Sequence, residues 1–399
     1  MPCPAERGML LWAHDAAQRY HGGIERASKG EGMSISKIVV TGGPCGGKTT
    51  ALSRIQRDLT HLGYTVLIVP ETATSLISGG VAPWTCGTNE EYQMCQMRLQ
   101  LEKERIFEQA AATMPNDKIV IVCDRGELDN KAYMNDEEFA HVLAYLGKTE
   151  VELRDDYDAV FHLVTAAKGA EEYYTLENNE ARYESVEEAA ELDDRFIEAW
   201  TGHPHFRVIG NETDFEEKMR RLMREVTYFL GELAPYEIER KFIIEFPDLA
   251  WLESQPTCQR VEIIQSYLRS EPDREVRIRK RGSGDNWMYY LTEKTLVEGK
   301  KRMETRRRLT DREYQTLLMQ ADPALRQISK MRYCLTYAGQ YFEIDVFPCW
   351  DDQAICEIEL TAEDTEVNFP EQIRVIREVT GDPTYRNAVI ASKPRGATH

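Results

Sequence analysis

A glycine-rich segment near the start of the chain carries residue types suited to holding phosphate. Residues 42–49, GGPCGGKT, match the pattern G-x-x-x-x-G-K-[ST]. Glycines let successive backbone N–H groups turn toward one anion, and the N-terminus of a following helix adds positive potential. In this pattern Lys48 reaches the β- and γ-phosphates and the Thr49 hydroxyl is a ligand of Mg²⁺. We therefore predict a nucleotide site formed by Gly43, Pro44, Cys45, Gly46, Gly47, Lys48, Thr49 and Thr50.

The elements around this segment decide between a phosphate loop and a glycine-rich turn with a stray lysine. Residues 37–41 predict a short buried strand, and residues 50–62 predict a helix. Strand, glycine loop and helix form the context that separates a phosphate loop from a chance match. We interpret the segment as a phosphate loop.

Two carboxylates follow later strands of the same region. Asp124 ends an apolar strand over residues 118–123, where a carboxylate of such folds holds Mg²⁺ directly or through water. A helix cap is the alternative role. The D-R-G sequence at 124–126 resembles the strand-end motif of nucleoside and nucleotide kinases, and Glu71 occupies the place where those kinases keep a catalytic carboxylate. We predict catalytic roles for Glu71 and Asp124, and metal binding by Asp124.

Further polar residues are candidates for contacts with the nucleotide. Kinases of this type place a lid with arginines near residues 167–184, which makes Arg182 and Arg195 candidates for neutralising phosphate charge. A solvated arginine is an equally good interpretation. Asn211, which follows a strand over 206–209, either touches a base or begins a turn. No N-K-x-D guanine signature occurs, so the residues alone do not separate GTP from ATP.

Alternation of strands and helices sets the fold class of residues 34–231. Further strands are predicted over 64–69 and 159–164, and Asn89 is a plausible N-cap for a long helix over 90–113. Continuous apolar strands separated by helices predict a parallel sheet with helices on both faces, an α/β phosphate-loop domain. Residues 1–33 are expected to form a flexible leader, and residues 232–235 a linker.

Composition narrows the class of protein. The chain has 399 residues, enough for two domains, and its 42% hydrophobic and 29% charged residues are typical of a globular protein. A formal net charge of −19 argues against nucleic acid as a partner. The nine cysteines show no C-x-x-C or zinc spacing, which favours reduced thiols and a cytoplasmic location.

From residue 236 the pattern changes to predicted strands in which every second residue is charged. Within most of these strands the charged residues have the same sign. An antiparallel sheet with one solvated face explains the alternation. However, two like charges about 6 Å apart repel by roughly 3 kcal/mol at an effective dielectric near 20. We therefore expect a polyanion and a divalent metal to supply the opposite charges. The basic pairs are Arg277/Arg279 and Lys330/Arg332, and the acidic pairs are Glu237/Glu239, Glu343/Asp345 and Glu357/Glu359.

The segment Glu237-x-Glu239-x-Lys241 resembles the opening of the CYTH, or triphosphate tunnel, family, and the resemblance extends over about residues 236–393 of a predicted barrel domain at 236–395. It implies a closed antiparallel barrel of eight strands whose inward bases grip a phosphate chain and whose inward acids hold Mg²⁺ or Mn²⁺. Residues 300–308 are more basic than the matching strand of the family, which favours anion binding over hydrolysis. The implied phosphate contacts are Lys241, Arg277, Arg279, Lys294, Arg306, Lys330 and Arg332. The implied metal ligands are Glu237, Glu239, Glu343, Asp345, Glu357 and Glu359, with Glu239 catalytic.

The combination of a NadR/AAA-like phosphate-loop domain with such a barrel resembles the TRPL translocation defect proteins. This resemblance implies a cytosolic GTP-binding regulator of membrane-protein trafficking whose barrel binds polyphosphate or the headgroup of an acidic phospholipid. It further implies peripheral contact with endomembranes, to which the basic residues 300–308 could contribute. Two alternatives stay open: a metal-dependent triphosphatase in the barrel, and a small-molecule or nucleoside kinase in the first domain.

Overall fold

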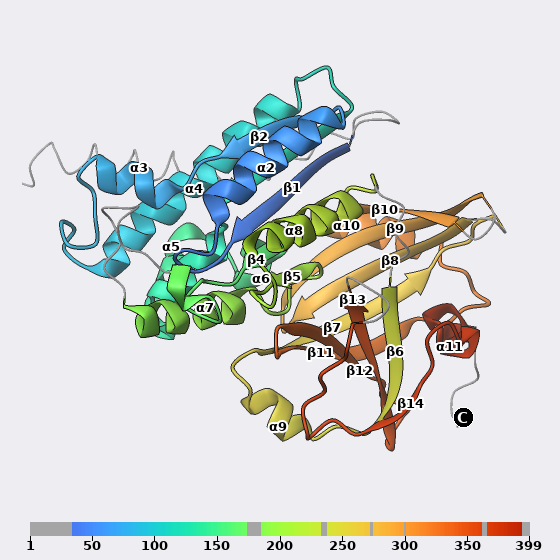
Figure 1. The fold of residues 1–399 in the computed structure, drawn as a ribbon. Coiled ribbons are helices and arrows are strands. Elements are labelled where there is room, and N and C mark those ends of the chain that lie inside the picture. Colours follow the sequence, from blue (N-terminus) through green and yellow to red (C-terminus); the bar gives the residue numbers. More distant parts are fainter. Residues whose placement is uncertain are drawn as a thin grey trace, which may run out of the picture.

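The computed structural model describes residues 34–173, 185–232, 238–271, 274–298, 301–360 and 365–392. The chain forms one five-stranded parallel sheet with helices, followed by one nine-stranded antiparallel sheet (Figure 1). The predicted fold class, an α/β phosphate-loop domain joined to an antiparallel tunnel-type domain, is confirmed. The predicted leader over residues 1–33 lies outside the described residues.

The parallel sheet is buried on both faces. Its order is β2-β3-β1-β4-β5, and its strands are β1 (Ser34–Thr41), β2 (Thr65–Val69), β3 (Lys118–Asp124), β4 (Ala159–Leu163) and β5 (Phe206–Ile209). On one face, Ile38 and Val40 of β1 pack with Ile55 and Leu222 in a single apolar cluster. On the other face, β1 contributes Val39 to a second apolar cluster. Apolar residues at consecutive positions therefore reflect helices on both sides, as the sequence predicted.

The helices that supply these two layers begin and end close to the expected places. The first layer contains α2 (Lys48–His61) and α8 (Phe215–Phe229), and the other contains α4 (Asn89–Ala111), α5 (Asp136–Leu146), α6 (Glu150–Arg154) and α7 (Val186–Trp200). The short helix α3 (Thr72–Ser78) and the 3-10 turns η1 (Glu127–Tyr133) and η2 (Glu171–Tyr173) lie in the connections. The prediction that Asn89 caps α4 is wrong by one residue: the Thr88 hydroxyl accepts a hydrogen bond from the Glu91 amide at 3.1 Å.

The antiparallel sheet has nine strands, one more than the family resemblance implied. Their order is β10-β9-β8-β7-β11-β12-β13-β6-β14, which makes β10 and β14 the outer strands among the described residues. The sheet is strongly curved, with β8–β10 above and β6 and β14 below in Figure 1. The strands are β6 (Ile238–Glu245), β7 (Cys258–Tyr267), β8 (Arg274–Ser283), β9 (Asn286–Glu298), β10 (Lys301–Leu309), β11 (Ile328–Tyr337), β12 (Gln340–Val346), β13 (Gln353–Leu360) and β14 (Val375–Glu378). The helices are α9 (Leu249–Ser254), α10 (Asp311–Leu318) and α11 (Asn387–Ser392), with the 3-10 turn η3 (Pro383–Tyr385) before α11.

The register of this sheet places the charged residues on one face. Arg332 lies opposite Asp345, and Glu357 lies opposite both Glu343 and Lys241. Because side chains alternate between faces along each strand, residues paired in this way project from the same side. The other face is apolar, and Phe342 and Ile344 pack there in a cluster that contains Leu252 of α9. We refer to the side that carries Arg332, Asp345, Glu357 and Lys241 as the charged face.

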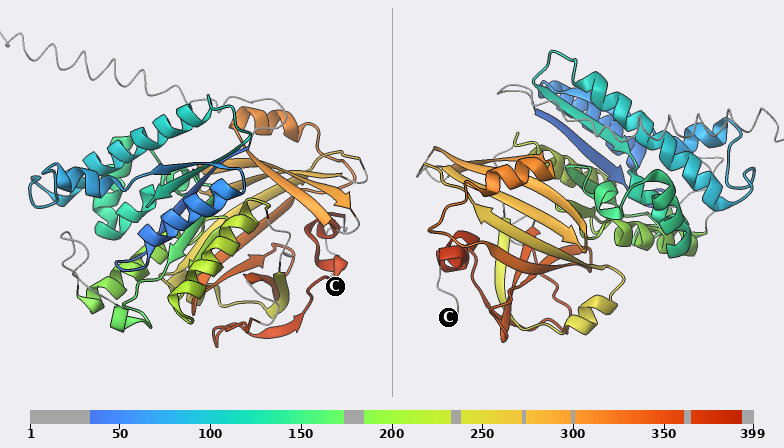
Figure 2. Two further views of the ribbon diagram at one scale, coloured as in Figure 1. Left: turned by 45° about the horizontal axis from the view of Figure 1, so that its top comes forward. Right: turned by 180° about the vertical axis from the view of Figure 1, so that it is seen from behind.

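The second domain packs against the amino-terminal edge of the parallel sheet. The contacts come from the turn before β4, at Asp155 and Asp156, and from the turn before β5, at residues 201–204. The phosphate loop follows β1 at the opposite, carboxyl edge (Figures 1 and 2). The two candidate sites therefore lie at opposite edges of one sheet. In the described part of the chain, no helix has the length and apolar character needed to cross a bilayer.

Candidate functional site

The phosphate loop joins β1 to the N-terminus of α2, as the sequence predicted. Lys48 is the first residue of α2, and its Nζ donates hydrogen bonds to the carbonyl oxygens of Gly42 at 2.9 Å and Gly43 at 3.1 Å. Gly42 and Gly47 have φ angles of 140° and 94°, which favour glycine. A Cβ on Gly42 would lie 2.0 Å from the Leu163 carbonyl oxygen. The glycines are therefore required by both backbone conformation and space.

Asp124 offers a carboxylate oxygen beside the loop. Its Oδ1 is buried and, among the described residues, has no hydrogen-bond partner. Burial, followed by the neighbouring charge of Glu71, raises the pKa of Asp124. Carboxylate and hydroxyl oxygens are ligands that Mg²⁺ prefers. The orphaned oxygen of Asp124, with the exposed Thr49 at the start of α2, therefore fits the predicted Mg²⁺ site.

Glu71 is engaged by an arginine that sequence analysis did not select. Arg125 Nε donates to Glu71 Oε1 at 2.6 Å, and Thr74 Oγ1 donates to the other carboxylate oxygen at 2.5 Å. Burial alone would raise the pKa of Glu71, but Arg125 and Lys48 outweigh it and lower the pKa to about 2. Glu71 is therefore ionised and anchors Arg125, whose guanidinium also stacks on Phe196 at 4.8 Å. A catalytic role for Glu71 stays a prediction, and the D-R dipeptide was the available signal for Arg125.

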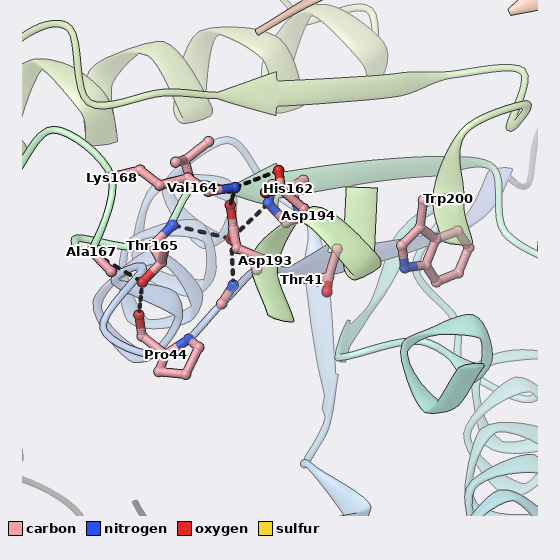
Figure 3. Close-up of polar contacts among 12 residues, drawn as sticks. Thr41, Pro44, His162, Val164, Thr165, Ala167, Lys168, Asp193, Asp194 and Trp200 are labelled. Atoms are coloured by element: carbon pink, nitrogen blue, oxygen red, sulfur yellow. Dashed lines mark hydrogen bonds and ion pairs between the residues drawn. The ribbon is translucent and has the colours of Figure 1, made fainter. Parts of the chain in front are cut away.

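Asp193 of α7 holds the phosphate loop from the side (Figure 3). Its Oδ1 accepts hydrogen bonds from the backbone amides of Gly43 at 2.9 Å and Thr165 at 3.1 Å, and it lies 3.0 Å from His162 Nε2. Lys168 Nζ donates to the second oxygen at 3.1 Å. Burial alone would raise the pKa of Asp193, but His162 and Lys168 together lower it. Sequence analysis missed this residue, because it stands among several other acidic residues of α7 without a motif of its own.

Asn211 is engaged in the same region. Its Nδ2 donates to the carbonyl oxygens of Thr165 at 2.8 Å and Lys168 at 2.7 Å, and its Oδ1 accepts from Lys218 Nζ at 2.7 Å. The amide thus fixes the turn after β4. Contact with a base stays a prediction for Asn211, and the predicted lid residue Arg182 lies outside the described residues.

The charged face of the antiparallel sheet contains rows of ion pairs between neighbouring strands. Arg332 donates to Asp345 Oδ1 at 2.7 Å and to Glu357 Oε2 at 3.0 Å, and it pairs with Glu343. The carboxylates outweigh the effect of burial and raise the pKa of Arg332 well above its usual range. Lys241 Nζ lies 2.7 Å from Glu357 Oε1. On these strands the like charges are therefore offset by opposite charges on the next strand. The basic pair Arg277/Arg279 is not offset in this way, because it lies opposite Thr292 and Tyr290, and the expectation of a polyanion stays a prediction there.

A more basic region of the charged face lies on β8 and β9. Arg277 and Arg279 of β8 sit opposite Thr292 and Tyr290, and Lys294 of β9 sits opposite Glu275. Next to them, Gln265 of β7 is 1% exposed, and its Nε2 is buried with no acceptor among the described residues. A buried amide donor beside arginines matches the needs of a phosphate oxygen. Sequence analysis missed Gln265, although a glutamine following two isoleucines was a usable signal.

The predicted metal site of the sheet does not fit a divalent cation in the described arrangement. Each described carboxylate of the predicted set contacts a basic side chain: Glu239 and Glu357 contact Lys241, Glu343 and Asp345 contact Arg332, and Glu359 contacts Arg207. Within the residues that the structure covers, no group of three acidic, histidine or cysteine side chains is placed to hold a metal ion. Glu237 lies outside that part of the chain, and Arg306 is described in its backbone alone.

Comparisons with known proteins bear on both domains. A family model described as an AAA domain matches residues 37–218. An inorganic triphosphatase of Acetivibrio thermocellus is 32% identical over 165 residues, which cover 40% of this chain and 94% of that protein. The chain belongs to this family of CYTH-like inorganic triphosphatases. The resemblance to the tunnel family is thereby confirmed, whereas membership of the TRPL translocation defect family stays a prediction.

Solved structures similar to part of this triphosphatase-family chain include the crystal structure of an inorganic triphosphatase. It is 27% identical, covers 41% of this chain and 98% of its own, and superimposes with a TM-score of 0.31. A protein from Pyrococcus horikoshii is 18% identical, with coverages of 32% and 81% and a TM-score of 0.25.

Proposed function

We propose that the chain has two phosphate sites with different ligands. The first domain binds a nucleoside triphosphate with Mg²⁺, and the charged face of the second domain binds a short phosphate chain and hydrolyses it. The proposal rests on one observation: Arg277, Arg279 and the buried donor of Gln265 lie on the same face of the sheet as Arg332. The relationship to a protein named inorganic triphosphatase supports the proposed substrate.

In the first site the chain supplies binding and orientation. The backbone amides of the loop and Lys48 hold the phosphates, while Thr49 and Asp124 would hold Mg²⁺, which offsets the phosphate charge when bound. Asp193 keeps the loop in shape through the Gly43 amide. GTP preference is a finer proposal that rests on the family resemblance, as are acidic phospholipid binding and a role in membrane-protein trafficking.

In the second site the chain presents donors to the oxygens of the substrate. Arg277, Arg279 and Gln265 lie on adjacent strands and bind the bridging region of a phosphate chain. Water attacks a terminal phosphorus, the bond from that phosphorus to the bridging oxygen breaks, and triphosphate becomes diphosphate and orthophosphate, while the proton lost by the water passes to solvent. Mg²⁺ or Mn²⁺ would bind the carboxylates of this face after these exchange their basic partners, Lys241 and Arg332, for the metal.

Calorimetry and phosphate release on the purified full chain test the two sites together. Tripolyphosphate, GTP and ATP are titrated separately, each with and without Mg²⁺ or Mn²⁺. We expect Lys48→Ala to abolish nucleotide binding and Arg279→Ala to weaken tripolyphosphate binding about tenfold, or about 1.4 kcal/mol. Arg260→Ala is the matched control, because Arg260 is an exposed arginine on the opposite side of β7.

The outcomes separate the alternatives. Tripolyphosphate binding that Arg279→Ala leaves unchanged would overturn the second site. Binding without phosphate release would leave a phosphate-binding regulator and exclude the triphosphatase. Transfer of phosphate from the nucleotide to a small molecule would instead support the kinase alternative for the first domain.

A further inference from the structure

We propose that the charged face is a compartment closed at both ends, which accepts short phosphate chains or the ends of longer ones and prevents long chains from threading through. The inference rests on the proposed function, because it names the substrate class of the same site. It is carried by two sets of contacts, one from the first domain and one from the C-terminal segment.

The first domain covers the basic part of one end. Arg281 of β8 is 2% exposed, and it donates to Asp155 Oδ2 at 3.0 Å and to the Gly202 carbonyl oxygen at 2.5 Å. Tyr290 of β9 donates to the same Asp155 oxygen at 3.3 Å. Arg308 of β10 donates to Asp156 Oδ1 at 2.6 Å. Two consecutive carboxylates of the first domain thus occupy the arginines that would otherwise face a phosphate chain.

At the same end, a basic side chain of the first domain covers the acidic strands of the second domain. Arg207 of β5 pairs with Glu359 of β13, and its Nε lies 3.2 Å from Glu225 of its own domain. Arg207 also lines a small cavity together with Glu343 and Glu357. The first domain therefore supplies acids to the basic strands and a base to the acidic strands.

Contacts on the remaining strands complete the closure. Tyr341 of β12 accepts a hydrogen bond from the Gly202 amide and donates one to the His203 carbonyl oxygen, both at 3.1 Å. Thr336 of β11 lies 3.2 Å from Thr201 between hydroxyl oxygens. Gly202 approaches Gln259 of β7 so closely that a Cβ would lie 2.6 Å from its side chain. The covered strands run without a break from β10 to β13 in the order of the sheet.

The C-terminal segment covers the opposite end. Three apolar residues project from the charged face, because each lies two positions from a residue of that face on the same strand. They are Ile243 next to Lys241, Tyr267 next to Gln265, and Ile355 next to Glu357. These three residues form an apolar cluster with Tyr385 of η3, and Ile390 of α11 packs against it. In Figure 1, α11 lies beside the second sheet, away from the helices of the first domain.

The distance between the two covers limits the ligand. Arg281 belongs to the cover formed by the first domain, and Arg277 lies opposite Tyr267 at the other cover. The two arginines are four positions apart on an extended strand, which is about 13 Å at roughly 3.3 Å per residue. A few linked phosphate groups span that distance. Because side chains fill both axial exits, a phosphate chain enters past the outer strands β10 and β14, and only the end of a long chain fits between the two covers.

Competition against tripolyphosphate by linear polyphosphates of increasing defined length tests the compartment. The full chain is used with saturating nucleotide, so that the first site is already occupied. Every linear polyphosphate has two ends, whatever its length. If only an end can enter, the inhibitory concentration, expressed as moles of polyphosphate molecules, differs by less than about threefold between short and long polyphosphates. Potency that rises in proportion to the number of phosphate units per chain would overturn the compartment.

An Asp156→Ala variant tests which element closes the end. Asp156 is half-exposed, and it also forms an ion pair with Lys37. In the variant Lys37 still has its ion pairs with Glu104 and Glu108, so the fold is expected to persist. In this variant we expect the inhibitory concentration of long polyphosphates, measured in competition against tripolyphosphate, to fall at least threefold. No such fall is expected in the exposed control Asp117→Ala. An unchanged length series in Asp156→Ala would overturn closure by the first domain. Failure of tripolyphosphate itself to bind would instead count against the proposed function.

Discussion

The backbone amide of Gly43 in the phosphate loop donates a hydrogen bond of 2.9 Å to Asp193, a residue 150 positions later in the chain. The same carboxylate oxygen accepts from the Thr165 amide, and Thr165 Oγ1 donates to the Pro44 carbonyl oxygen at 2.5 Å. The loop is therefore held both by its own glycines and by α7. A side chain far from the motif takes part in setting the geometry of the phosphate site.

Replacing Asp193 by asparagine should weaken nucleotide binding about tenfold, or about 1.4 kcal/mol. Asparagine has nearly the same shape but loses the charge that pairs with Lys168 and the strength of the hydrogen bond to the Gly43 amide. Calorimetry with GTP and ATP measures the loss. Asp194→Asn is the matched control, because Asp194 is exposed and also contacts Lys168. An equal loss in both variants would show that the Lys168 contact alone matters.

Lys48 should make nucleotide binding sensitive to alkaline pH. Burial, followed by the charge of Arg125, lowers the pKa of Lys48 to about 8. The side chain is therefore charged below that value and loses its proton as the pH rises through it, which removes a favourable contact with phosphate. We expect the dissociation constant measured between pH 7 and pH 9 to rise in the wild type and to stay nearly flat in Lys48→Arg. The same slope in both proteins would assign the dependence to another group.

Asp124→Asn should stabilise the free protein while removing the response to Mg²⁺. The pKa of Asp124 is raised in the folded chain, so its ionised form costs folding free energy at neutral pH, and this cost appears as the pH rises above the ordinary range of aspartate. Asparagine has no charge to bury. Thermal melting should show a higher midpoint without ligand and a smaller shift on adding nucleotide with Mg²⁺. A lower melting midpoint of Asp124→Asn without ligand would contradict the conclusion that Oδ1 of Asp124 has no stabilising partner in the free protein.

Local patterns of sequence predicted much of the fold, because the forces behind them act over a few residues. The spacing of Gly42, Gly47 and Lys48 set the phosphate loop, and apolar runs set the buried strands. The cap of α4 was misplaced because Thr88 and Asn89 are both good capping residues. The pairs Arg277/Arg279 and Glu357/Glu359 predicted a charged face, which the register of the sheet supports.

Contacts between distant segments were not predictable in the same way. Whether a bound ligand or a neighbouring strand balances Arg332 depends on which strands pair, and alternation within a strand does not reveal the pairing order. Asp193 and Gln265 gain their roles from the segments packed against them. The role of Asp155 and Asp156 depends on how two domains pack, and single-sequence patterns do not reveal that arrangement.

The ion pair between Arg281 and Asp155 should contribute strongly to the stability of the two-domain structure. Removing one partner of a buried pair leaves an uncompensated charge, which costs about 3–5 kcal/mol. Burial alone would raise the pKa of Asp155, but Arg281 and Arg154 together hold it well below its ordinary range. Asp155 therefore stabilises the fold above that range, and the contribution is lost as the pH falls below about 4.

Urea unfolding of Arg281→Ala at neutral and acid pH measures both effects. We expect a loss of about 3 kcal/mol at pH 7 and a smaller difference from the wild type below about pH 4, where the carboxylate of the wild type also loses its advantage. Arg274→Ala is the control on the same strand, since Arg274 pairs with Glu293 in an exposed position and such pairs contribute about 0–1 kcal/mol. Equal losses in the two variants at pH 7 would contradict a special role for the domain boundary. A loss in Arg281→Ala that does not shrink in acid would assign it to packing of the arginine rather than to its charge.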